Sequence, residues 1–172
     1  MASIFGHSIV AFTISKVINN NNLKWLILLA IVSAILPDLD VISFSLAIPY
    51  EHPFGHRGFS HSICFAIIWA LGLMFYFGKS NRLIWFLVIF LSTVSHGVFD
   101  AMTSGGRGVG FFIPINNDRY FFPFRGIKVS PIGIEDFLSS WGTQVILSEL
   151  KYIIIPCIIV LLILKLIRKR FK

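Results

Sequence analysis

The sequence predicts an all-α fold, a polytopic membrane bundle of about four to five transmembrane helices with a long extramembrane loop rich in glycine and aromatic residues. Of its 172 residues, 56% are hydrophobic and 13% are charged, whereas soluble domains contain roughly 45–50% apolar residues. The net charge of +7 does not indicate a nucleic-acid partner, because many cations lie between or after apolar runs, as topology signals do.

The apolar runs define the expected helices. The first, residues 4–18, is amphipathic and either crosses the membrane or lies against the bundle. The other four are expected at about residues 23–36, 60–77, 83–99 and 152–167. The asparagine run 19–22 predicts a turn. The N-terminus lacks a cationic region and a cleavage site, so the first helix is expected to stay in the protein. Cys64 and Cys157 lie inside apolar runs and indicate no disulfide framework.

Residues 101–150 form a long connection that is rich in glycine and aromatic side chains. Aromatic rings are favoured at membrane interfaces, so this segment is predicted to be an interfacial flap. Within it, Ser130 followed by Pro131 and then acids predicts a helix start. The chain 1–172 is thus expected to be one integral membrane domain, with metal-site helices in 1–100, the flap in 101–150 and a transmembrane helix in 151–168.

Histidines and aspartates lie at the ends of these expected helices. They are His7 at the first start, Asp38 and Asp40 at the second end, His56 and His61 at the third start, and His96 and Asp100 at the fourth end. In an antiparallel bundle, the start, end, start and end of four successive helices lie on one side of the membrane. The topology therefore predicts that four helix ends build one polar cluster.

The charges divide between the two sides of the membrane. The side opposite the histidines has nine cations and no acid, a formal charge of +9, from Lys16, Lys24, Lys79, Arg82, Lys165, Arg168, Lys169, Arg170 and Lys172. The histidine side has the other six cations and all eight acids, a formal charge of −2. The positive-inside rule then predicts an inner-membrane, multi-pass protein with a cytoplasmic C-terminus and a site on the periplasmic side.

The convergence of imidazoles and carboxylates predicts a divalent metal site. A carboxylate inside a bilayer costs about 2.5–3.5 kcal/mol, which a bound cation would offset. The expected ligands are His7, Asp38, Asp40, His56, His61, His96 and Asp100. Such ligands suit zinc or manganese, as one ion or two. Acids solvated at the interface, a His96–Asp100 hydrogen bond and an interfacial polar cluster remain alternatives, and His52 is assigned to such a cluster.

Taken together, the motifs resemble those of the bacterial inner-membrane metal-dependent hydrolase family, the LexA-binding, inner-membrane-associated (YdjM-like) group. The matching features are Gly6-His7, "PDLD", "HRGFSHS", "SHGVFD", Thr103 with Gly106, and Pro123-Phe124, which cover roughly residues 1 to 135. The chain is more distantly similar to zinc-dependent phospholipase C. No histidine follows His96, so the later histidine ligands of that enzyme are missing and a three-zinc site is in doubt.

The preferred hypothesis is a membrane-embedded metal-dependent hydrolase. A bound metal would activate water at neutral pH. Asp40 is expected as a bridging ligand or general base, and Arg57 as a residue that steadies an anionic substrate oxygen. The partners are expected to be membrane lipid and a phosphoester or lipid-linked substrate. Two alternatives remain: an ion transporter, and a non-enzymatic scaffold that binds a regulator, in which the basic tail "KLIRKRFK" holds a partner or anionic lipid.

Overall fold

The computed structural model describes residues 1–19 and 23–170 and confirms an all-α helix bundle. Its helices are α1 (Ile4–Ile18), α2 (Lys24–Ile35), α3 (Ile42–Ser45), α4 (Ile63–Phe77), α5 (Arg82–Ala101), α6 (Ile134–Phe137), α7 (Ser140–Glu149) and α8 (Ile155–Arg170). Two 3₁₀ turns, Leu36–Val41 and Phe59–His61, precede α3 and α4, and a π-helix, Leu150–Ile154, joins α7 to α8. Within the described ranges there is no β-strand, only two isolated bridges, Thr103–Ile127 and Val109–Tyr120.

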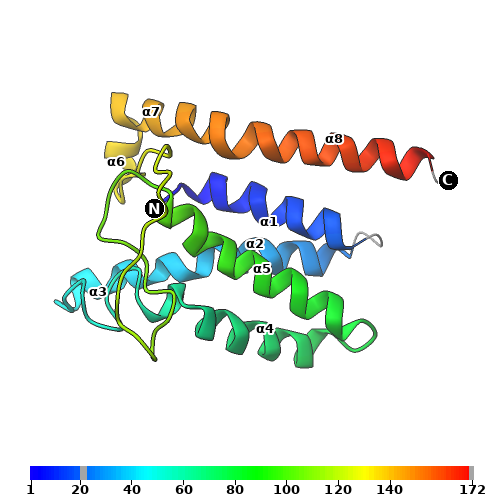
Figure 1. Cartoon of the computed structure of the whole chain (residues 1–172), viewed down its shortest axis with the longest axis horizontal. Helices are drawn as coiled ribbons and strands as arrows, with labels where there is room; N and C mark the ends of the chain where they lie inside the picture. Colours follow the sequence, from blue (N-terminus) through cyan, green and yellow to red (C-terminus); the bar gives the residue numbers. More distant parts are fainter. Residues whose placement is uncertain (20–22, 171–172) are drawn as a thin grey trace.

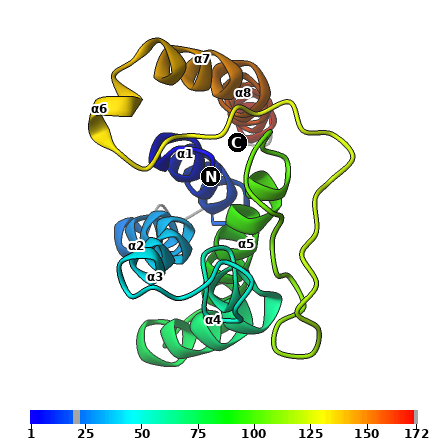
Figure 2. The same ribbon diagram turned by 90° about the vertical axis from the view of Figure 1, so that its left-hand side faces the viewer.

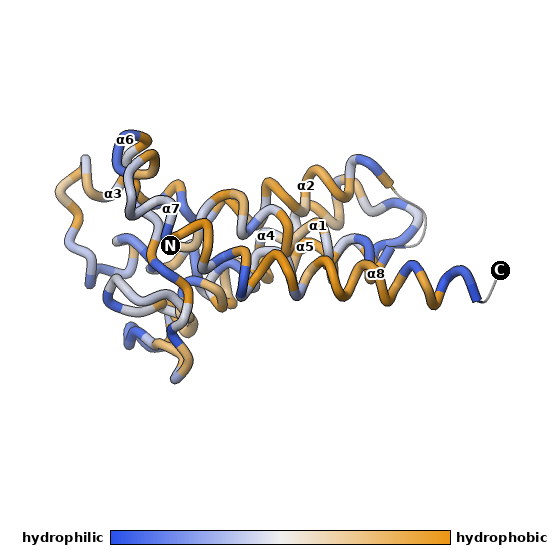
Figure 3. Tube along the Cα trace, turned by 90° about the horizontal axis from the view of Figure 1, so that it is seen from above, coloured by the Kyte–Doolittle hydropathy of each residue, from blue (hydrophilic) through white to orange (hydrophobic). Residues whose placement is uncertain are grey.

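The long helices run antiparallel, so alternate helix ends meet (Figure 1). The starts of α1, α4 and α7 and the ends of α2 and α5 lie at one end of the bundle, which we call the site end. The α4–α5 turn and the end of α8 lie at the other end. Apolar residues dominate the helix bodies, whereas hydrophilic residues gather at the two ends (Figure 3). This arrangement confirms the predicted convergence of four helix ends.

Three helical segments are long and apolar enough to cross a membrane: Lys24–Ser45, Arg82–Ala101 and Ser140–Arg170. The helices α1 and α4 are apolar but shorter, at 15 residues each. The first of the three spans is longer than residues 23–36 because the 3₁₀ turn and α3 continue α2 in the same segment. The two aspartates of "PDLD" therefore lie within this candidate span.

Small side chains let the central helices approach one another closely, as is usual where helices pack inside a bilayer. Four alanines at the contacts of α1, α2, α4 and α5 are fully buried, namely Ala11, Ala30, Ala34 and Ala70. The indole of Trp69 on α4 donates a hydrogen bond of 2.9 Å to the Ser33 hydroxyl on α2. By contrast, only 6% of the most apolar 18-residue stretch of the α7–α8 segment is buried inside the protein. Its apolar surface is suited to lipid.

The connection after α5 is only partly the extended flap that the sequence predicts (Figure 2). The expected helix start at Ser130 is wrong: α6 begins at Ile134 with Gly133 as its N-cap residue. The Ser130 hydroxyl instead contacts the Pro131 carbonyl at 3.3 Å. A second helix, α7, also forms within this connection, where the Ser139 hydroxyl accepts from the Trp141 amide. Both cysteines are free, as expected. Residues 20–22 of the predicted turn at Asn19–Asn22 and the last two residues of the basic tail lie outside the described residues.

Candidate metal centre

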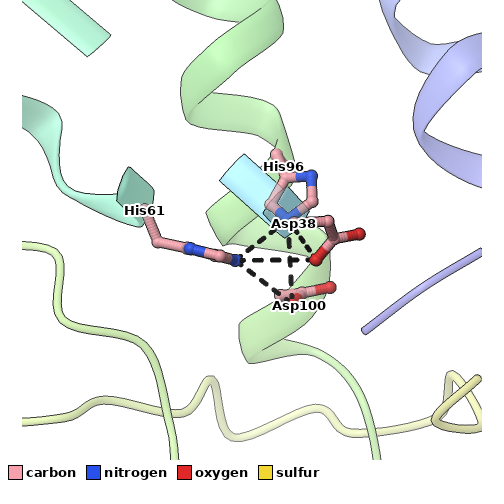
Figure 4. Close-up of side chains that lie close together, drawn as sticks. All are labelled: Asp38, His61, His96 and Asp100. Atoms are coloured by element: carbon pink, nitrogen blue, oxygen red, sulfur yellow. Dashed lines mark hydrogen bonds and ion pairs between the residues drawn. The ribbon is translucent and has the colours of Figure 1, made fainter. Parts of the chain in front are cut away.

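Four buried side chains converge at the site end: Asp38, His61, His96 and Asp100 (Figure 4). Asp38 comes from the 3₁₀ turn after α2, His61 from the turn before α4, and His96 and Asp100 from one face of α5, four residues apart. One ligand atom from each lies within 4.8 Å of the other three. Three segments that are distant in sequence therefore contribute to one cluster.

The distances between these ligand atoms fit a single small cation. The two imidazole Nε2 atoms are 3.0 Å apart, and His96 Nε2 is 3.3 Å from Asp38 Oδ1. His61 Nε2 lies 3.7 Å from Asp100 Oδ2 and 3.9 Å from Asp38 Oδ1. A tetrahedral zinc site with ligand bonds of about 2.0–2.1 Å has ligand–ligand distances of about 3.3–3.4 Å. Three of the distances match this size to within about 0.4 Å, and the two of 3.9 Å, from His61 to Asp38 and from His96 to Asp100, are about half an ångström longer.

Both histidines direct their Nε2 atoms toward this space. His96 Nδ1 lies 2.6 Å from the Ala34 carbonyl, and His61 Nδ1 lies 3.0 Å from Asp40 Oδ2. Carbonyls and carboxylates only accept, so each Nδ1 carries a hydrogen and each Nε2 is the nitrogen that a metal ion would bind. Neither Asp38 Oδ1 nor Asp100 Oδ2 has a hydrogen-bond partner. A cation would bind these two oxygens together with the two Nε2 atoms, so the donor set fits a metal.

Charge around His61 supports the same conclusion. Burial lowers the pKa of His61, but the carboxylates of Asp100 and Asp40 outweigh this effect and raise it to about 9. The metal-free cluster therefore keeps a proton where a metal ion would bind.

Asp40 lies behind His61 and outside the four-atom cluster. Its Oδ2 accepts hydrogen bonds from the Arg57 amide at 2.9 Å and the Ser60 hydroxyl at 2.6 Å. Its Oδ1 lies 2.5 Å from His56 Nδ1. The placements of Asp40 and His56 thus differ from the expectation that both bind the metal directly. In a 3₁₀ turn of about three residues per turn, side chains two positions apart point in different directions, so Asp38 and Asp40 separate.

Asp100 uses its two oxygens on different partners. Its Oδ1 accepts a 2.8 Å hydrogen bond from the Ala2 amide and lies 3.4 Å from His7 Nε2. Its Oδ2 faces both the cluster and the Arg57 Nε, at 3.0 Å. The carboxylate is therefore fixed in place, and it ties the first residues of the chain to α5.

Arg57 is held inside the protein rather than presented to a substrate. Its side chain is 1% exposed, and its guanidinium also donates to the Gly105 carbonyl at 3.1 Å and the Thr103 hydroxyl at 3.2 Å. Gly106 adopts a positive φ of 85°, and a Cβ there would lie 2.5 Å from the guanidinium. The Thr103 and Gly106 motif therefore accommodates Arg57. This placement differs from the expectation that Arg57 steadies an anionic substrate oxygen.

His7 lies beside the cluster. Its ring stacks on His96 with centroids 3.9 Å apart. It is buried, and neither of its nitrogens has a hydrogen-bond partner. The structure therefore brings His7 next to the metal cluster without placing it among the four converging residues.

Glu149 is a buried carboxylate that the sequence reasoning did not single out. It lies at the end of α7, is 2% exposed, and accepts from both the amide and the hydroxyl of Ser3, the latter at 2.5 Å. Gly6 makes room for it, because a Cβ there would lie 3.2 Å from its carboxyl carbon. Its position inside an apolar span was the available signal, since an ionisable residue in such a span marks a candidate functional position.

Comparisons with known proteins agree with this membrane architecture. The family model described as YdjM inner membrane protein matches residues 1–171. The curated inner membrane protein YbcI of Escherichia coli (strain K12) is 34% identical over 160 residues, which cover 91% of this chain and 92% of that protein. No solved structure matches.

Proposed function

The chain belongs to the YdjM inner membrane protein family, and we propose that it is a metal-dependent hydrolase working at the membrane surface. The observation that supports this most strongly is the convergence of buried ligand atoms on Asp38, His61, His96 and Asp100, of which the two carboxylate oxygens have no hydrogen-bond partner. Zinc is the preferred ion, because two imidazoles and two carboxylates are ordinary zinc ligands at this spacing. Manganese is the alternative.

Each neighbouring residue has a defined part in this proposal. Asp40 and the Ala34 carbonyl fix the tautomers of His61 and His96 so that both Nε2 atoms face the ion. Arg57 holds the Asp100 carboxylate rather than the substrate. His7 is a further ligand if a second ion binds, because its nitrogens are unpaired beside Asp100 Oδ1. When bound, zinc lowers the pKa of its water to about 7 and polarises a phosphoryl or acyl oxygen.

Metal analysis of the purified protein tests this proposal. We expect stoichiometric zinc in the wild type after detergent extraction and metal add-back, and none in His96→Ala. His52→Ala is the matched control, because His52 is exposed and its ring only accepts from the Phe54 amide. The hydrolase assay uses phospholipid vesicles and a soluble phosphodiester with the zinc-loaded protein. Wild-type protein without stoichiometric metal would refute the metal site, and loaded protein without hydrolysis would refute the enzyme.

The completeness of the ligand set favours a second candidate, a scaffold in which the metal only stabilises the fold. Four protein ligands are typical of structural zinc, whereas catalytic zinc keeps a position for water. In that case zinc removal lowers thermal stability and no substrate is turned over. Asp38 borders a cavity, so a substrate or water molecule that reached a bound metal ion would approach from the side of Asp38. Transport is less well supported, because the ligands gather at one end of the bundle.

The sided distribution of charge also supports an orientation. We propose that the cation-rich end, with Arg168, Lys169 and Arg170 in the last turn of α8, faces the cytoplasm and that the metal centre faces the periplasm. A pair of C-terminal fusions tests this, with one reporter active only in the cytoplasm and one active only outside it. Activity of the external reporter would reverse the orientation.

A further inference from the structure

A cavity of about 240 Å³ borders the metal centre. Its walls are residues 1–5 on one side and residues 130–134 with Phe137 on the other, and Asp38 also borders it. Asp38 is 9% exposed, and its Oδ1 has no hydrogen-bond partner. The cavity therefore leads to one of the four proposed metal ligands.

The walls are apolar apart from a few groups that are already engaged. Asp38 is the one ionisable side chain in the lining, which contains no lysine or arginine. The Ser3 hydroxyl donates to Glu149, and the Ser130 hydroxyl contacts the Pro131 carbonyl. The nearby guanidinium of Arg57 does not line the cavity and contacts Asp100, Gly105 and Thr103. The α-amino group of Met1 also borders the cavity, but it is buried and interacts electrostatically with the Asp100 carboxylate. Because the remaining lining is apolar and contains no cationic side chain, it fits a hydrocarbon chain.

The cavity is continuous with an exposed apolar surface. Ile4 and Phe5 at the start of α1 are 57% and 68% exposed, and Ile132 and Ile134 opposite them are 60% and 80% exposed. The rings of Phe5 and Phe137 lie 6.4 Å apart across the two walls. These residues belong to α1, to α6 and to the loop before α6 at the site end. Large apolar side chains so placed are stabilised by lipid.

We propose that this cavity takes the hydrocarbon chain of a membrane phospholipid, which enters between the start of α1 and α6. The inference rests on the proposed hydrolase function and names its substrate class. The chain occupies the apolar cavity, and the ester or phosphoester group lies at its inner end, next to Asp38. The negative charge of the headgroup is met by the ion rather than by a cationic side chain.

The test is photocrosslinking in vesicles of phosphatidylethanolamine and phosphatidylglycerol that contain a phosphatidylethanolamine with a photoreactive acyl chain. The zinc-loaded wild type should crosslink within residues 1–5 and 130–137, as mapped by mass spectrometry. Ile134→Asp places a charge at the cavity and should reduce this yield about tenfold, the effect of losing one large apolar contact. Leu138→Asp is the matched control, because Leu138 is 81% exposed and does not line the cavity.

The outcomes separate the chain site from the enzyme. Crosslinks confined to other segments, or an equal loss in both variants, would overturn the proposed chain site. Crosslinks at the cavity without phospholipid hydrolysis would retain the chain site and reject the hydrolase. Hydrolysis that Ile134→Asp leaves unchanged for long-chain phospholipids would show that the substrate chain binds elsewhere. Zinc content measured in all variants confirms that the metal centre is intact.

Discussion

Replacing Asp40 by asparagine distinguishes a residue that orients a ligand from one that binds the metal. Asp40 accepts from His56, Arg57, Ser60 and His61. Asparagine keeps one oxygen for the three donors on Oδ2, and His56 can change tautomer to accept from the new amide. The fold should therefore survive, while the charge that holds His61 in place is lost.

Such outer residues typically change metal affinity by about 10–100-fold, which corresponds to about 1.4–2.7 kcal/mol. We expect Asp40→Asn to weaken zinc binding by this factor and to bind the same amount of zinc at saturation. The assay is competition against a chelator of known zinc affinity in detergent, with metal counted by mass spectrometry. Asp118→Asn is the control, since Asp118 is exposed and contacts Asn116. Zinc content as low as in His96→Ala would show direct ligation, and unchanged affinity would remove the orienting role.

Three further predictions concern the buried charged residues. Arg57→Lys keeps a charge beside Asp100 but loses the planar guanidinium, so we expect the free energy of unfolding to fall by about 1–3 kcal/mol for each buried group left unpaired, measured as a lower thermal midpoint with zinc retained. Loss of phospholipid turnover at full stability would instead indicate that Arg57 contacts the substrate. Zinc affinity should rise about tenfold per pH unit up to about pH 9, because zinc displaces the proton that the raised pKa of about 9 keeps on His61. The same proton stabilises the metal-free protein, which should therefore lose stability as the pH rises from about 6.5 to about 9. Zinc titrations that give the same affinity at every pH would contradict both expectations. Glu149→Leu leaves the buried amide and hydroxyl of Ser3 without their acceptor. It should lower the free energy of unfolding of the zinc-loaded protein by about 1–3 kcal/mol, measured by thermal unfolding. An unchanged stability would mean that this contact does not hold the N-terminal residues in place.

The sequence was sufficient for the convergence of the ligands, because that depends only on helix order. Antiparallel spans bring the end of α2, the start of α4 and the end of α5 together, whatever the packing details. Which of these residues join the four-residue cluster and which lie behind it could not be predicted. The sequence does not distinguish Asp38 from Asp40, and only the 3₁₀ geometry separates the residue that joins the four-residue cluster from the residue that supports His61.

The role of Arg57 was hidden for a similar reason. The sequence around Arg57 does not show whether its guanidinium is buried or exposed. The burial depends on Thr103 and Gly106, which follow α5 and lie next to the guanidinium. The α7 helix and Glu149 were missed because the last span was expected to begin near Tyr152. The apolar segment in fact begins at Ser140, so the carboxylate lies within it.

The contacts of the first residues also constrain the order in which the protein is built. Ala2 donates to Asp100 and Ser3 donates to Glu149, across 98 and 146 positions of sequence. During synthesis, Ser3 emerges long before its acceptor, and the metal ligands on α5 are complete before α7 exists. The start of α1 can therefore take its final position only after the last span has been inserted. The cavity wall that this segment forms is thus one of the last parts of the protein to be completed.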